Sequence, residues 1–157
     1  MRIRLVVVGR TAPFLASAVD EYRGRLARYA EVEILAAPSA DWPSAPGPAE
    51  IRRLLDEEAV RAERLWQGER RVLLARDGVQ RPSEATAAWL DDLEGASVRS
   101  LGLLVGGPGG VAEALAARAD QRWSLGPATL PHTLASVVVL EQLYRAYRIR
   151  RGEPYHH

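Results

Sequence analysis

Short apolar runs alternate with amphipathic stretches along the whole chain, and no other feature of the sequence constrains its fold more. Val, Leu and Ile fill the runs, as in buried strands, whereas the stretches repeat apolar residues every three or four positions, as in helices. The runs predict strands at residues 3–8, 32–35, 71–75, 101–105 and 123–125. The stretches predict helices at residues 13–28, 49–66, 82–93, 111–119 and 133–148. This alternation predicts an α/β fold, with a mainly parallel sheet flanked by helices on both faces.

Local turn chemistry sets several boundaries between these elements. Asp77-Gly78 is predicted to close the third strand, because glycine favours a turn there. Ser83 is expected to cap the helix that follows, with Glu84 in its first turn. Residues 38–48 contain four prolines and are expected to form an exposed loop.

The composition is that of one ordinary globular domain covering residues 1–157. Without cysteine the chain has no disulfides and no thiolate catalysis, and its three histidines make a histidine-rich metal site improbable. All 21 basic residues are arginine, yet the formal net charge is only +1, so overall charge gives no argument for nucleic-acid binding. No apolar run approaches the roughly 18–20 residues of a membrane span, and the start lacks a signal peptide's long apolar core. We therefore expect a cytoplasmic protein that uses neither a membrane nor a metal.

Two of the predicted strands end abruptly in glycine-rich segments. Residues 106–110 follow the strand at 101–105, and residues 126–131 follow the strand at 123–125. Glycine has no Cβ atom, so such a loop can adopt positive φ angles and let a ligand lie directly on its amides. Each segment alone is better explained as a tight turn. Two in succession, the second ending in Leu130-Pro131-His132, indicate two backbone loops that face one pocket.

Residues 107–112 also match the dinucleotide-binding pattern G-x-G-x-x-A, but their context argues against that function. A dinucleotide-binding fold expects a carboxylate about 20 residues further on, at the end of the next strand. The corresponding residues 123–129 contain no acid. A chain without lysine also lacks the lysine of a phosphate-binding Walker loop.

The last predicted helix is apolar around most of its circumference. Its large apolar residues are Leu134, Val137, Val138, Val139, Leu140, Leu143, Tyr144 and Tyr147. Such a helix must be covered on more than one side. In a chain of this size, a partner subunit can bury the second apolar side of the helix. The alternative is that the helix lies at the centre of the monomer and is buried by its own chain.

Five segments, in this order, carry a family resemblance. They are Val105-Gly106-Gly107-Pro108-x-Gly110, Trp123-Ser124-Leu125, Thr129-Leu130-Pro131-His132, Leu140-Glu141-Gln142-Leu143-Tyr144-Arg145-Ala146 and Pro154-Tyr155-His156. They resemble the SPOUT methyltransferase family, and within it the small RlmH-type enzymes that methylate N3 of a pseudouridine in large-subunit ribosomal RNA. The resemblance implies a C-terminal deep trefoil knot over about residues 100–150, an exception to the usual absence of knots. It also implies an antiparallel homodimer with S-adenosylmethionine (SAM) bound in the knot.

The resemblance also implies which residues bind the cofactor and which take part in catalysis. SAM contacts would come from Leu74, Gly106, and the loop residues Leu125, Gly126, Pro127, Ala128, Thr129 and Leu130. N3 of a pseudouridine carries a proton that must be removed as the methyl group is transferred. His156 is the candidate base, with Arg145 stabilising the developing charge and Tyr155 orienting the ring. His132 and Arg145 also have structural alternatives, in starting the last helix and in holding a phosphate or the dimer.

Several positions depart from the family pattern and leave the acceptor open. Gly109 stands where the family usually has glutamate, Ser136 where an arginine is common, and Ala75 where an aspartate is frequent. The loop at 38–48 lacks the lysines of relatives, while Arg145, Arg148, Arg150 and Arg151 remain near Tyr155. Three functions follow: methylation of ribosomal RNA, methylation of a ring nitrogen in a small heterocyclic molecule, or RNA binding by a non-catalytic dimer.

Overall fold

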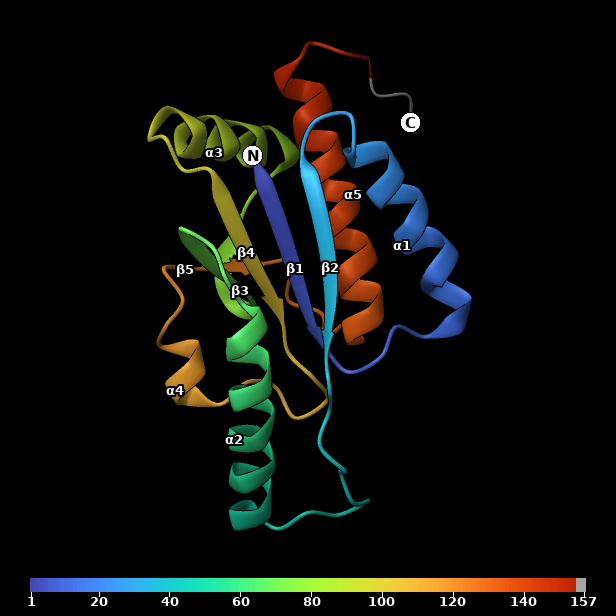
Figure 1. Cartoon of the computed structure of the whole chain (residues 1–157), viewed down its shortest axis with the longest axis vertical. Helices are drawn as coiled ribbons and strands as arrows, with labels where there is room; N and C mark the ends of the chain where they lie inside the picture. Colours follow the sequence, from blue (N-terminus) through green and yellow to red (C-terminus); the bar gives the residue numbers. More distant parts are fainter. Residues whose placement is uncertain (155–157) are drawn as a thin grey trace.

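The computed structural model describes residues 1–154, which form a five-stranded sheet with helices on both faces (Figure 1). The strands are β1 (Arg2–Val8), β2 (Glu31–Ala37), β3 (Arg70–Gln80), β4 (Ser100–Val105) and β5 (Gln121–Ser124). The helices are α1 (Pro13–Leu26), α2 (Pro48–Leu65), α3 (Ser83–Gly95), α4 (Glu113–Ala116) and α5 (His132–Arg150). The strand order is β2-β1-β4-β3-β5, and every pair of neighbouring strands is parallel. The predicted α/β fold is confirmed.

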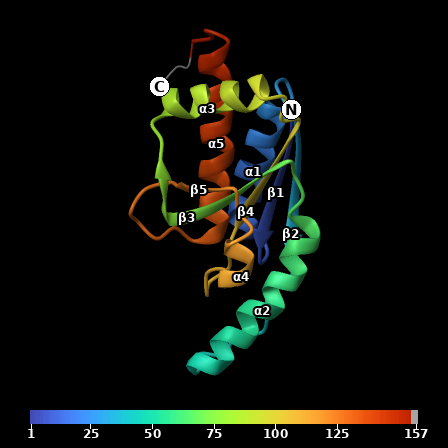
Figure 2. The same cartoon turned by 90° about the vertical axis from the view of Figure 1, so that its left-hand side faces the viewer.

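Alternating side chains of the strands build an apolar layer on each face of the sheet. On β1, Ile3, Leu5 and Val7 belong to the core formed with α1, α3 and α5, whereas Val6 and Val8 belong to the core formed with α2 and α4. A parallel sheet covered on both faces needs strands that are apolar on both sides, which explains the nearly continuous apolar runs. Both views show α3 crossing one end of α5, while α2 extends beyond the opposite end of the sheet (Figure 2).

The parallel arrangement brings the ends of β1, β4 and β5 to the same end of the sheet, beside the middle of β3. Helix α5 begins at this end, where the Nε2 atom of His132 lies 3.2 Å from the carbonyl oxygen of Arg10, just after β1. Strand β5 is the outermost strand on the far side of β3. The segment at 125–131 must therefore run back past β3 and β4 before α5 can start.

Helix α5 occupies the centre of one helical layer. It packs between α1 and α3 and against β1 and β4, which buries Val139, Leu140, Leu143 and Ala146 completely. A central position within the monomer thus accounts for most of the apolar circumference. What remains is a narrower strip on which Leu134 is 36% exposed and residues 137 and 138 are half-buried. No helix within residues 1–154 is long and apolar enough to cross a membrane.

Three local predictions are wrong, and in the first two a distant contact outweighs local preference. Strand β3 does not end at Asp77-Gly78 but continues to Gln80, since residues 79 and 80 pair with β5. Ser83 does not cap α3, and its hydroxyl donates instead to Oε1 of Gln142 on α5 at 3.2 Å. The helix predicted at 111–119 is reduced to the single turn of α4.

Candidate functional site

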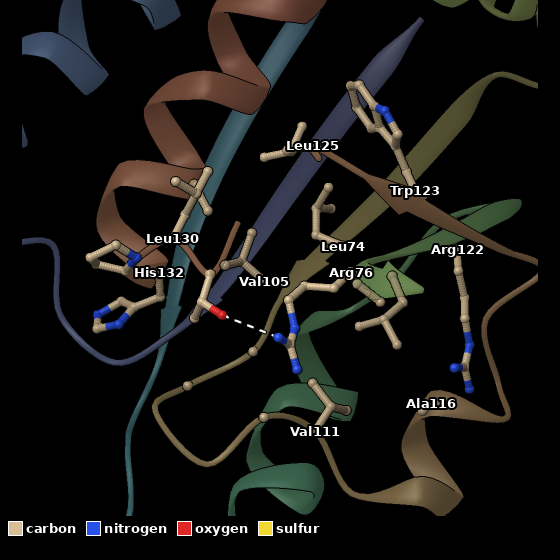
Figure 3. A pocket seen from close by; sticks show the side chains of 18 of the residues that line it. Leu74, Arg76, Val105, Val111, Ala116, Arg122, Trp123, Leu125, Leu130 and His132 are labelled. Carbon is tan, nitrogen blue, oxygen red and sulfur yellow. Dashed lines mark hydrogen bonds between the residues drawn. The ribbon is translucent and has the colours of Figure 1, made fainter. Parts of the chain in front are cut away.

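A cavity of about 890 Å³ opens beyond the ends of β4 and β5, beside the middle of β3 (Figure 3). Most of its lining comes from three segments, at residues 73–76, 105–111 and 122–132, and Glu113 and Ala116 of α4 and Ala135 of α5 complete it. A volume of this size is typical of small-molecule sites. Of the predicted cofactor contacts, the lining includes Leu74, Gly106, Leu125, Gly126, Ala128, Thr129 and Leu130. Pro127 belongs to the same loop but does not line the cavity.

The loop after β4 is both a tight turn and a wall of the cavity. The amide of Gly110 donates to the carbonyl oxygen of Gly107 at 3.0 Å, and Gly110 has a φ of +92° that favours glycine. A Cβ atom on Gly106 would lie 2.6 Å from Cγ2 of Val111 and 2.8 Å from the carbonyl oxygen of Gly110. The loop therefore closes on itself without room for a side chain at position 106. The segment is thus a tight turn and, at the same time, one wall of the cavity.

The loop after β5 turns at a second glycine. Gly126 has a φ of +125°, and its amide donates to Oγ of Ser124 at 3.2 Å while the same hydroxyl donates back to the carbonyl oxygen of Gly126 at 3.1 Å. These two bonds direct the chain away from β5 and across the cavity. Leu125 and Leu130 then flank the stretch of main chain that faces the cavity.

The walls of the cavity are mainly apolar, with polar groups restricted to a few positions. Leu74, Val105, Leu125 and Leu130 form the aliphatic surface, and the buried Trp123 lies behind them with its ring 5.9 Å from that of Trp89. Main-chain amides and carbonyls of the two glycine loops supply hydrogen-bonding groups between these walls. Such an arrangement fits a flat, uncharged ring system, which can bond to the main chain at its edge while its faces contact leucine.

Two arginines in the lining were not predicted from the sequence. Nη1 of Arg76 donates to Oγ1 of Thr129 at 3.3 Å, and Nη1 of Arg122 pairs with Oδ2 of Asp77 at 2.6 Å. Arg76 was missed because Asp77-Gly78 was expected to end the strand just beyond it. The alternation of side chains along β3 is broken there, so no local periodicity reveals where Arg76 points.

His132 is the first residue of α5 and also lines the cavity. It therefore has the predicted structural role of starting the last helix and is also part of the candidate site. A Cβ atom on Gly9 would lie 3.0 Å from Nε2 of His132, because the ring packs directly against the backbone that leaves β1. The 3.2 Å contact with the carbonyl of Arg10 requires the proton on Nε2. This bond fixes the ring at the point where α5 meets the sheet.

Behind the glycine loop lies a buried carboxylate that sequence reasoning also missed. Glu58 on α2 is 3% exposed, and its Oε1 accepts hydrogen bonds from the amide of Ala40, Oγ of Ser39 and Nε1 of Trp42, at 2.9, 2.9 and 2.7 Å. The indole of Trp42 lies against Gly109, where a Cβ atom would be only 2.2 Å from Cη2. The loop at 38–48 is thus tied to α2 and packed against the loop after β4.

The predicted catalytic residues do not meet in this cavity within the described chain. Arg145 lies on α5, half-buried, and its Nη2 pairs with Oε1 of Glu141 at 2.9 Å. It follows His132 by 13 positions, which along a helix is a separation of about 20 Å. Tyr155 and His156 lie outside the described residues. Within one chain, Arg145 therefore lies apart from the cavity.

The arginines near the end of α5 are engaged within the chain. Nε of Arg150 pairs with Oδ1 of Asp91 at 2.6 Å, and Nε of Arg148 pairs with Oε2 of Glu153 at 2.8 Å. The guanidinium of Arg151 lies 4.6 Å from the ring centre of Tyr29. Nearby carboxylates and the tyrosine ring thus partly compensate the positive charge of these arginines.

No group of three or more residues suited to hold a metal ion occurs between residues 1 and 154.

Comparisons with known proteins agree with this geometry. A family model described as "Predicted SPOUT methyltransferase" matches residues 1–156. Proteins named ribosomal RNA large subunit methyltransferase H from Listeria welshimeri and Moorella thermoacetica are 38% and 39% identical to the chain, over 99% of both partners in each case. A probable methyltransferase from Bordetella pertussis has a similar fold, with a TM-score of 0.56 and 18% identity over 92% of this chain and 95% of that one.

Proposed function

Because the chain belongs to the SPOUT methyltransferase family, we propose that it methylates N3 of a pseudouridine in large-subunit ribosomal RNA, with SAM as methyl donor. Membership of this family identifies the chain as a methyltransferase. The proposal of the acceptor rests on relatives that match it from end to end and carry a ribosomal RNA name. The structural observation that carries the proposal is the convergence on one cavity of three separate segments predicted to bind SAM, namely the middle of β3 and the loops after β4 and β5.

The residues of the cavity fit the chemistry of SAM. We propose that Leu74, Gly106 and residues 125–130 hold it, with leucine walls against the adenine and main-chain groups at the edge of the ring. Gly106 lines the cavity without a side chain, so its backbone can lie directly against a ligand. SAM supplies a methyl group on a positively charged sulfur, and the chain's task is then to position the acceptor nitrogen in line with it.

We further propose that the active site is composite and forms in a homodimer. Arg145 lies ten positions after Ala135, the last residue of α5 that lines the cavity, or about 15 Å along its own helix, and an antiparallel partner would bring a second Arg145 toward it. The strip of α5 that the monomer leaves partly exposed, around Leu134, Val137 and Val138, would lie in the interface. Arg145, His156 and Tyr155 would then act on the acceptor held beside the partner's SAM site.

Within this site the residues of the chain have separate tasks. The N3 proton passes to His156 as general base, while the guanidinium of Arg145 stabilises the negative charge that develops on the ring. Tyr155 holds the plane of the ring. Glu141 keeps the Arg145 side chain oriented through the 2.9 Å ion pair.

The knot is proposed for about residues 100–150, within a single domain of residues 1–157. Its support is the path of the chain after β5, which leaves the outer edge of the sheet and returns past β3 and β4 to start α5 beside β1. A knot would hold together the three segments that line the cavity, without a metal ion or a disulfide.

The test is the choice of acceptor. Purified protein and isotope-labelled SAM are incubated separately with assembled ribosomes, free ribosomal RNA and a soluble metabolite extract, over a series of salt concentrations. We expect the label on ribosomal RNA, with transfer that weakens as salt rises, because phosphate contacts release counterions. Inert ribosomes and RNA, together with a labelled small heterocycle, would contradict the proposal.

A further inference from the structure

One guanidinium in the lining of the cavity has no carboxylate partner within residues 1–154. Arg122 is neutralised by Asp77, with 2.6 Å between Nη1 and Oδ2. Arg76 forms no ion pair in this part of the chain, and its Nη1 donates to the neutral hydroxyl of Thr129 at 3.3 Å. A single acid of the lining, Glu113, likewise forms no ion pair there. The cavity therefore offers one uncompensated charge of each sign.

The backbone of β3 aims Arg76 into the opening. Pairing with β5 shifts register between Leu74 and Val79, so residues 75–78 bulge out of the strand. Gly78 fits tightly against β5, where a Cβ atom would be 2.7 Å from the main chain of residues 122 and 123. A bulge of this kind redirects side chains. Figure 3 shows the Arg76 side chain reaching from β3 across the opening to Thr129 in the loop after β5.

We propose that Arg76 binds the α-carboxylate of the methionine moiety of SAM, an inference that rests on the proposed function. Thr129 uses one of the five N–H donors of the guanidinium, and the others suit two parallel bonds to a carboxylate. The leucine walls cannot take a carboxylate, since burying an unpaired charge in apolar surroundings is costly. The amino acid end of SAM also carries an ammonium group, for which Glu113 is the matching charge in the lining.

The test compares two ligands on four proteins by calorimetry. The ligands are S-adenosylhomocysteine and its decarboxylated analogue, which differ only in the carboxylate. The proteins are the wild type, Arg76→Leu, the conservative variant Arg76→Lys, and Arg122→Leu as the matched control, because the guanidinium of Arg122 also lines the cavity but already has Asp77. The ratio of the two dissociation constants in each protein isolates the contribution of the carboxylate.

We expect the wild type and Arg122→Leu to bind S-adenosylhomocysteine about tenfold to a hundredfold more tightly than the analogue. Arg76→Leu should bind both ligands almost equally, and Arg76→Lys should keep part of the preference. A wild type without the preference, or an Arg76→Leu variant that retains it, overturns the proposal. Retention of the preference with a weaker salt dependence of RNA binding would assign Arg76 to a phosphate instead. If neither ligand binds the wild type, the SAM site itself is refuted, and the proposed function with it.

Discussion

The contact between Trp42 and Gly109 gives the prediction that the structure defines most sharply. Any side chain at position 109 would place its Cβ atom 2.2 Å from Cη2 of Trp42 and 2.5 Å from Cζ2. The indole cannot yield without loss, because its Nε1 donates to the buried carboxylate of Glu58 at 2.7 Å. Gly109→Glu, which introduces the residue usual in the family, should therefore displace the ring and break that bond. Overpacking and the lost bond to a charged acceptor together should lower the free energy of unfolding by about 2 kcal/mol.

If the clash with the indole causes the destabilisation, Gly109→Glu should no longer lower the free energy of unfolding when the indole is absent. In a Trp42→Ala background, Gly109→Glu should cost less than about 0.5 kcal/mol, so the double-mutant cycle should show a coupling of about 1.5 kcal/mol. Gly24→Glu is the matched control, because a Cβ atom on Gly24 meets nothing within 4 Å. Urea unfolding at one fixed protein concentration measures all four variants and the wild type. Costs that add within about 0.5 kcal/mol, or a Gly109→Glu variant as stable as Gly24→Glu, would refute the account of this loop.

Three further predictions concern assembly, the composite site and pH. Val138→Asp places a charge on the partly exposed strip of α5 and should give a monomer or an aggregate in sedimentation velocity; an unchanged dimer would remove α5 from the interface. Gly106→Val, which blocks the glycine loop, and Arg145→Ala should each be inactive alone, yet their co-expressed mixture should recover about a quarter of the wild-type rate if each site uses both subunits. No recovery would place Arg145 in its own subunit's site. Burial, reinforced by the charge of Glu94, raises the pKa of Tyr147 to about 12, so this group's contribution to stability is complete below pH 10 and is lost as pH rises toward 12. Relative to Tyr147→Phe, the wild type should lose about 2 kcal/mol of unfolding free energy between pH 10 and pH 12, and equal slopes would contradict the shift.

The sequence predicts most of the fold because periodicity and buried runs are local properties. All five strands and all five helices occur where apolar alternation and helical spacing predict them, apart from the boundaries already described. The glycine loops were also recognisable, since Gly110 and Gly126 adopt the positive φ angles that explain their identity. Of the eight residues predicted to contact the cofactor, six lie in these loops and line the cavity, and Leu74 of β3 is the seventh.

The features that could not be predicted depend on contacts between distant segments. The bulge that aims Arg76 exists because β3 and β5 pair out of register, 40 or more residues apart in the chain. Glu58 reads as one more charge on an amphipathic helix until the loop at 38–48 folds over it and supplies three donors. The role of α5 is ambiguous for a related reason, since a helix apolar all round can be covered by its own chain, by a partner, or by both.

The identity of the methylated nucleotide tests the central claim most directly. Ribosomal RNA from the reaction with wild-type protein is digested to nucleosides and to fragments, and both are analysed by mass spectrometry. The account predicts one added methyl group per large-subunit RNA, at N3 of a pseudouridine, and none when that position is an unmodified uridine or when Gly106→Val replaces the wild type. A methyl group on another base, or on no RNA at all while a soluble heterocycle is methylated, would contradict it.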